Sequence, residues 1–267
     1  MDECNNIEQI ADLAIAASKV ETSIPYAVLP QGYSLKSLED FMVDENQVKQ
    51  SVAVQTASSL VAYVARYKDE RTVIFADKDK TLFHAVIDYH LNSTTPEKVT
   101  HDVTYDCPLS DEWRLVLGYD KEKLNQVEFA EFLEQNINLI APVGESYAGP
   151  SGAELLQMVL SFQETRESVF KSVQRLQDGT CQFSFSDEKA GHGNTQLPER
   201  ISLAISPFRN GLPYQMDARI RYRLRDGRLI LWYELIEPQK IIDHAFNEIL
   251  VDLQNQLPDV PVFEGRI

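Results

Sequence analysis

The alternation of hydrophobic and polar residues is clearest near the C-terminus, on either side of the Asp226-Gly227 pair. Hydrophobic residues occupy every second position there, and the side chains of a β-strand alternate between its two faces. Asp-Gly between two such runs is the strongest short-range indication of a hairpin, because a type I′ turn needs positive φ at both residues. We therefore predict a β-hairpin over residues 218–235.

The two faces of this hairpin differ in chemistry. A two-residue turn determines the register, which predicts the cross-strand pairs Arg225–Arg228, Arg223–Ile230, Arg221–Trp232 and Arg219–Glu234. One face is hydrophobic and carries Ile220, Tyr222, Leu224, Leu229, Leu231, Tyr233 and Leu235. The opposite face, called the arginine face below, carries Arg219, Arg221, Arg223, Arg225, Arg228 and Trp232. We expect Trp232 to form a cation–π pair with Arg221, and Glu234 an ion pair with Arg219.

Periodicity predicts further elements before residue 145. A helix starts near Thr56 and another covers Val127–Ile140. Three runs predict an antiparallel meander: Thr72–Ala76, Leu82–Leu91 and Asp102–Tyr105, the last with a continuation through Trp113–Leu117.

The second half of the chain is predicted to begin with a long helix. Ser151 and Glu154 have the spacing of a capping box, and the helix they open runs to about Gln177, before Asp178-Gly179. The elements expected after it are strands at Cys181–Ser186 and Ile201–Ile205, a flexible loop at 191–194, and a last helix from Pro238.

These elements predict an α+β protein in which two antiparallel β-containing halves are joined by the long helix. Residues 1–47 form an N-terminal arm, with an alanine-rich helix over 6–19 followed by an extended connector. The first half spans residues 48–145 and holds the meander; the second spans 146–267 and holds the hairpin and the last helix.

Charge sets the arginine face apart from the rest of the chain. The sequence has 25 Lys+Arg and 41 Asp+Glu, for a net charge of −16. Residues 219–228 carry a local +4, which leaves −20 for all other residues. Nucleic-acid affinity comes largely from basic surface, so the bulk charge argues against a non-specific nucleic-acid binder. A basic stripe on an acidic protein indicates one specific anion or an acidic protein surface; a solvated edge that prevents aggregation is the alternative.

The cysteines indicate a reducing compartment. Cys4, Cys107 and Cys181 are far apart and form neither a metal-ligand spacing nor a disulfide framework. Residues 1–4 have no basic n-region and no long apolar run follows them, so we expect no signal peptide, and no run approaches the ~18 apolar residues of a membrane span. We expect a cytoplasmic protein with no membrane partner.

Candidate catalytic chemistry is sparse. Walker, Rossmann and serine-hydrolase motifs are absent, and we expect no cofactor. The best metal-like set is His84, Asp88 and His90, which share one face if they lie on one strand, with His101 on the next strand. The simpler interpretation is a polar, solvent-facing side of the sheet.

An ordered set of short motifs resembles the YfdQ-like prophage protein family, whose function is unknown. The set is Ser58–Val64, Ile74–Asp77, Ala85–His90, His101-Asp102, Glu112-Trp113, Gln126–Glu134, Phe170–Ser172 and Pro261–Gly265. Relatives commonly have an aromatic where Leu60 stands and a second tryptophan where Val116 lies. The resemblance implies a prophage origin and an accessory, non-virion role in the bacterial cytoplasm, and it implies no reaction.

Taken together, these features favour a non-enzymatic, homo-oligomeric binding protein. Its arginine face would engage a phosphate-bearing small molecule or an acidic surface on a host protein. Three alternatives stay open at this point. They are a ring- or shell-forming assembly protein, a single-strand DNA annealing protein, and a metal-dependent hydrolase.

Overall fold

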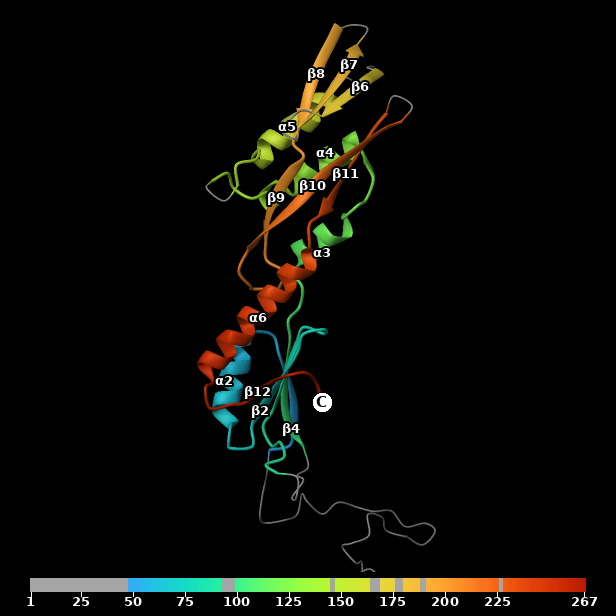
Figure 1. The fold of residues 1–267 in the computed structure, drawn as a ribbon. Coiled ribbons are helices and arrows are strands. Elements are labelled where there is room, and N and C mark those ends of the chain that lie inside the picture. The colour runs from blue at the N-terminus through green and yellow to red at the C-terminus, as the bar shows by residue number, and fades with distance from the viewer. Residues whose placement is uncertain are drawn as a thin grey trace, which may run out of the picture. The chain divides into compact units, whose positions relative to one another are not determined.

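The structure is a computed structural model that describes residues 48–92, 99–144, 147–163, 169–175, 180–187, 191–225 and 228–267 (Figure 1). The expected helix at 6–19, the connector at 20–47 and the Asp226-Gly227 turn lie outside the described residues. Residues 48–267 form one unit, and the α+β class is confirmed. None of the described helices combines the length and the apolar character that a membrane crossing requires.

The first sheet contains five strands in the order β1-β4-β3-β2-β12. Their bounds are Gln50–Val54 (β1), Val73–Asp77 (β2), Leu82–Val86 (β3), His101–Asp106 (β4) and Val262–Glu264 (β12). The central β2, β3 and β4 form the predicted antiparallel meander. The edge strands β1 and β12 pair in parallel with β4 and β2, so the sheet is mixed.

One face of the first sheet is covered by α2 (Ala57–Tyr67) and α6 (Pro238–Gln256). Figure 1 shows both helices on the same side of the sheet. Phe83 of β3 stacks on Phe246 of α6 with 4.4 Å between ring centroids. Alternate residues of β3 therefore point into a core with these helices, and the others point to the opposite face.

The second sheet has four strands in the order β5-β11-β10-β9. Their bounds are Leu124–Asn125 (β5), Arg200–Ile205 (β9), Tyr214–Arg225 (β10) and Arg228–Leu235 (β11). Against one face lie α3 (Asp111–Gly118), α4 (Gln126–Gln135) and the 3-10 turn η2 (Ile137–Leu139). Tyr233 of β11 joins these layers, because its ring lies 5.8 Å from that of Phe132 and its hydroxyl donates to the Val116 carbonyl at 2.7 Å.

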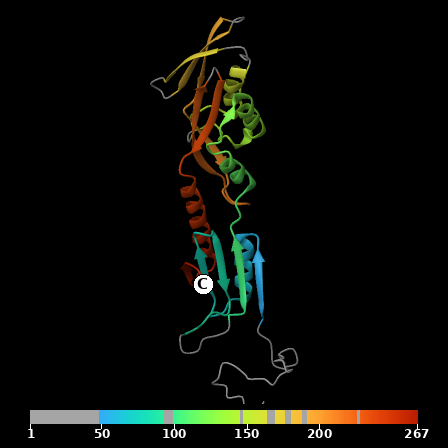
Figure 2. The same cartoon turned by 90° about the vertical axis from the view of Figure 1, so that its right-hand side faces the viewer.

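The predicted long helix is wrong beyond its first half. Helix α5 spans Gly152–Gln163, and Val169–Arg175 is strand β6. β6 pairs with β7 (Cys181–Asp187), which pairs with β8 (Gly191–Leu197) in a three-stranded antiparallel sheet (Figure 2). Val169, Phe170 and Val173 suit a strand, and pairing with β7 outweighs the modest helix propensity of the segment. The expected flexible loop at 191–194 is likewise part of β8.

Three smaller predictions are also corrected. Trp113–Leu117 is part of helix α3, because Ser110 accepts from the Trp113 amide as an N-cap. The strand expected to reach Leu91 ends at Val86. The helix expected over Val127–Ile140 ends at Gln135, where the Asn136 side chain donates to a carbonyl of the last turn.

Each of the first two sheets contains a strand from the other side of the expected boundary at 145/146. Strand β5 precedes the boundary but pairs with β11 in the second sheet. Strand β12 is at the C-terminal end but pairs with β2 in the first sheet. The division into halves therefore stays a prediction, and the sheet pairing does not follow it.

Candidate functional site

The hairpin that carries the arginine face has the predicted register. Strands β10 and β11 pair Arg219 with Glu234, Arg221 with Trp232, Arg223 with Ile230 and Arg225 with Arg228. Directly opposed residues share one face of an antiparallel sheet. The four pairs therefore lie on the same side of the second sheet, as the alternation of the sequence predicts.

The opposite side of the hairpin is buried, as predicted. Five of its hydrophobic side chains belong to the core: Ile220, Leu229, Leu231, Tyr233 and Leu235. Tyr233 among them contacts the layer of α3 and α4, so the arginine face points away from that layer. Arg223 and Arg228 are exposed, and Arg219, Arg221 and Trp232 are half-buried. The side chain of Arg225 lies outside the described part of the structure.

Strand β9 adds an arginine that the sequence analysis missed. Arg200 is exposed and pairs with Arg219 in the sheet register, so it lies on the same face. It directly precedes Ile201, where the predicted strand began. Its membership of the arginine face depends on pairing between β9 and β10, which periodicity within either strand does not reveal.

One carboxylate occupies the centre of the arginine face. Glu234 accepts from Arg221 Nε at 2.9 Å and from Trp232 Nε1 at 3.3 Å. The hydrogen bond from Arg221 holds the pKa of Glu234 below its usual value. The expected Arg219–Glu234 pair is wrong, because long side chains also reach diagonal neighbours across a sheet. No described cation lies over the Trp232 ring, so the expected cation–π pair is not formed.

Four more guanidinium groups lie on this face. Among the described residues, no aspartate or glutamate lies within ion-pair distance of Arg200, Arg219, Arg223 or Arg228. Asp217, also on this face, accepts instead from the Ser202 hydroxyl. Within the described part of the chain, four cations on this sheet face are therefore available to an external anion.

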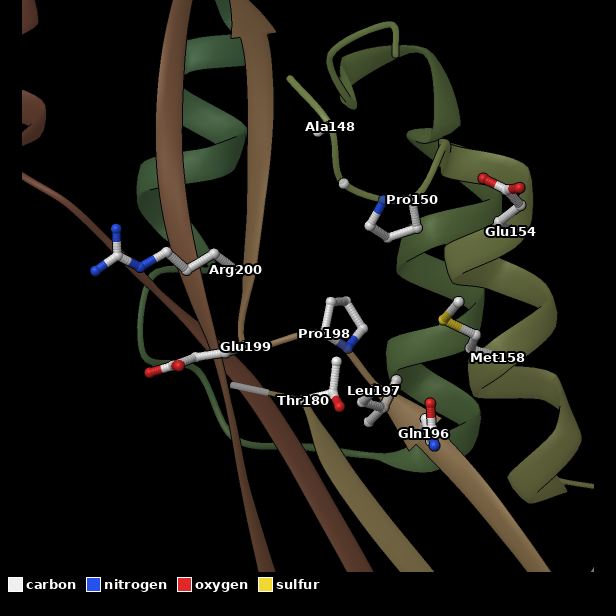
Figure 3. Close-up of a pocket in the computed structure, with 11 residues that line it drawn as sticks. Ala148, Pro150, Glu154, Met158, Thr180, Gln196, Leu197, Pro198, Glu199 and Arg200 are labelled. Atoms are coloured by element: carbon white, nitrogen blue, oxygen red, sulfur yellow. The ribbon is translucent and has the colours of Figure 1, made fainter. Parts of the chain in front are cut away.

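A broad cavity adjoins the Arg200 end of this face (Figure 3). It has a volume of about 760 Å³ and lies between α5 and the segment before β9. The side chain of Met158 points toward Pro198, whereas the Arg200 guanidinium points away from α5. Glu154 accepts from the Ser151 amide and hydroxyl, and these hydrogen bonds lower its pKa. This carboxylate caps α5, and Glu199 is the other carboxylate that lines the cavity.

The candidate metal ligands are not brought together. His84 Nε2 lies 3.0 Å from Asp102 Oδ2, whereas His101 Nε2 lies 2.9 Å from the Tyr63 hydroxyl on the other face of the sheet. The expectation that Asp88 shares a strand face with His84 is wrong, because β3 ends before it.

Asp88 has a structural role instead. It accepts from the amides of Thr100 and His101, at 2.8 and 3.0 Å. Burial opposes ionisation, but these hydrogen bonds outweigh it and lower the pKa of Asp88. Within the described residues, no group of three or more histidines, cysteines, aspartates and glutamates is placed to hold a metal ion; His90 also belongs to no such group.

The chain matches, over residues 2–267, the family described as "Uncharacterized conserved protein (DUF2303)". It belongs to this family. No curated protein and no solved structure matches this DUF2303 chain. The arginine face is therefore interpreted from its own chemistry, and the resemblance to YfdQ stays a prediction.

Proposed function

We propose that this DUF2303 chain is a non-enzymatic binding protein whose arginine face binds a phosphate-bearing anion. The observation that carries the proposal is that Arg200, Arg219, Arg223 and Arg228 share one open sheet face without a carboxylate partner among the described residues. A guanidinium is planar and donates two parallel hydrogen bonds to phosphate or carboxylate oxygens. Because the supporting strands are buried on their other side, the arginines are held on a rigid element.

In the simplest competing interpretation the arginine face is only solvated and binds no anion. A binding measurement distinguishes the two interpretations. We would titrate inorganic tripolyphosphate into the protein by calorimetry at low salt. The test variant replaces Arg219, Arg223 and Arg228 with Ala; the control replaces the exposed Arg66, Lys80 and Lys240 with Ala, which removes the same charge elsewhere.

We expect the arginine-face variant to lose at least tenfold in affinity and the control to lose much less. Circular dichroism should show both folded, since the replaced side chains lie outside the core. Equal binding by wild type and the arginine-face variant, or no binding by the wild type, would overturn the proposal.

We also propose that the protein self-associates, and the charge distribution along the chain supports this. The chain outside residues 219–228 carries −20, so the arginine face is complementary in charge to a second copy. We propose a homo-oligomer, and native mass spectrometry tests it. A monomer at every concentration contradicts it; a large assembly that the arginine-face variant loses would favour a ring- or shell-forming protein.

The cellular setting is also a proposal. The resemblance to the YfdQ-like family supports a prophage-encoded accessory protein in the cytoplasm of a bacterial host. The test is quantitative mass spectrometry of induced cells and purified virions. We expect the protein in the cytoplasmic fraction; enrichment in virions would argue for a structural role in the particle.

A further inference from the structure

We infer that the anion bound by the arginine face is the backbone of a single-stranded nucleic acid. This inference rests on the proposed function and specifies its ligand class. Two properties of the face support it: the spacing of the arginines along β10 and the position of Trp232 beside them.

The spacing of the arginines suits an extended phosphodiester chain. Arg219, Arg221 and Arg223 alternate along β10, so their Cα atoms recur about every 6.8 Å along an antiparallel strand. Three backbone bonds of an extended chain cover roughly 3.5 Å, so the six bonds of one nucleotide cover about 7 Å. Arg221 is paired with Glu234, so Arg219 and Arg223 can meet every second phosphate of an extended strand. Arg200 and Arg228 widen the row on the neighbouring strands.

Trp232 favours an unpaired base over a duplex. Its indole lies opposite Arg221, in the middle of the row, and is half-buried. An aromatic ring stacks on a base only when that base is free of its neighbours, which is the usual arrangement in single-strand binding. The hydrogen bond from Nε1 to Glu234 orients the ring without using its π-faces.

The acidic bulk of the chain does not prevent such binding. Charges more than about 8 Å apart are largely screened at physiological salt, so the local row decides the attraction. The length of the row limits the site to a few phosphates. Arg219 and Arg223 are four residues apart, or about 14 Å, which corresponds to three phosphates.

The test is fluorescence anisotropy with labelled oligothymidylate of four and of twelve nucleotides, a duplex of the same length, and tripolyphosphate as competitor. We expect similar affinity per site for the short and long strands, weaker duplex binding, and competition by tripolyphosphate. A site with three or four phosphate contacts predicts a slope of about −2 to −3 in log K against log salt.

Trp232→Ala and Trp232→Phe separate stacking from charge. We expect Trp232→Ala to lower the affinity for the oligonucleotide by at least ~5-fold and to leave tripolyphosphate binding unchanged. Trp232→Phe should keep most of the affinity for the oligonucleotide. Tripolyphosphate binding without oligonucleotide binding would overturn this inference and leave the proposed function standing. Duplex binding equal to single-strand binding, or an unchanged Trp232→Ala variant, would also overturn it. If neither ligand binds, both the inference and the proposed function fail.

Discussion

At the scale of single residues, Glu234 sets how much positive charge the arginine face offers. Its carboxylate is bound to Arg221 Nε at 2.9 Å and to the Trp232 indole at 3.3 Å. The Glu234 carboxylate thus neutralises Arg221 and also orients the Trp232 ring. A substitution at this one position should change both stability and binding.

Glu234→Gln should tighten anion binding. The amide keeps a similar shape but removes a negative charge beside the row, which frees the Arg221 guanidinium for an external phosphate. We expect a gain of a few-fold in tripolyphosphate affinity, measured by calorimetry at one salt concentration. A loss of affinity would indicate that Glu234 serves mainly to hold Arg221 in place.

The same variant should reveal a pH-dependent contribution to stability. The folded-state pKa of Glu234 is lowered, so the pair stabilises the protein fully above the ordinary glutamate pKa of about 4.3. This stabilisation is lost as the pH falls through the lowered folded-state pKa. Because the pair is about a third exposed, we expect Glu234→Gln to lower the free energy of unfolding by only ~0.2–1 kcal/mol at pH 7. Urea titrations at pH 7 and pH 3 should show the difference shrinking at low pH.

At the scale of elements, α6 supports the first sheet although it follows the strands of the second. Phe246 is buried on this helix, and its ring stacks on Phe83 with an interplanar angle of 11°. Strand β12, which follows α6, then joins the edge of the same sheet. The C-terminal segment therefore contributes a helix layer and a strand to a sheet built mostly from residues before 107.

Phe246→Ala should be strongly destabilising. Removing a buried phenylalanine leaves a cavity that the neighbouring layers fill only in part, which costs about 3–5 kcal/mol. Val251→Ala is the matched control, because Val251 lies on the same helix and is 54% exposed. Its effect should stay within ~0.5 kcal/mol. Chemical denaturation measures both; similar effects would show that the packing of α6 on the sheet is unimportant.

At the scale of the whole chain, the sheets link segments that are distant in sequence. The backbone amide of Ser110 donates to the Pro207 carbonyl at 3.0 Å, and Leu109 forms a β-bridge with Phe208. Together with β5 and β12, these contacts join the parts before and after residue 145. We expect the two halves to depend on each other for folding.

Separate expression of residues 48–145 and 146–267 tests this expectation. The first fragment loses α6 and β12 from its sheet, and the second loses β5, α3 and α4 from its own. We expect neither fragment to unfold cooperatively alone, whereas co-expression should restore a folded complex. Two fragments with sharp, independent thermal transitions would instead support the boundary at 145/146.

The sequence by itself determined the features that depend on neighbours along the chain. The hairpin register and its two contrasting faces follow from a two-residue turn and a period of two, so Arg219, Arg221 and Arg223 were placed correctly. The meander and the helix from Pro238 also follow from patterns among residues that are close in sequence.

Only the tertiary structure decided the features that depend on distant pairing. The parallel edges β1 and β12 and the addition of Arg200 by β9 join residues far apart in sequence. Residues 169–175 form a strand because β7 pairs with them, although a helix is the locally expected continuation of α5. Glu234 contacts Arg221 and not its directly opposed Arg219, because the reach of long side chains across a sheet is a property of three-dimensional packing.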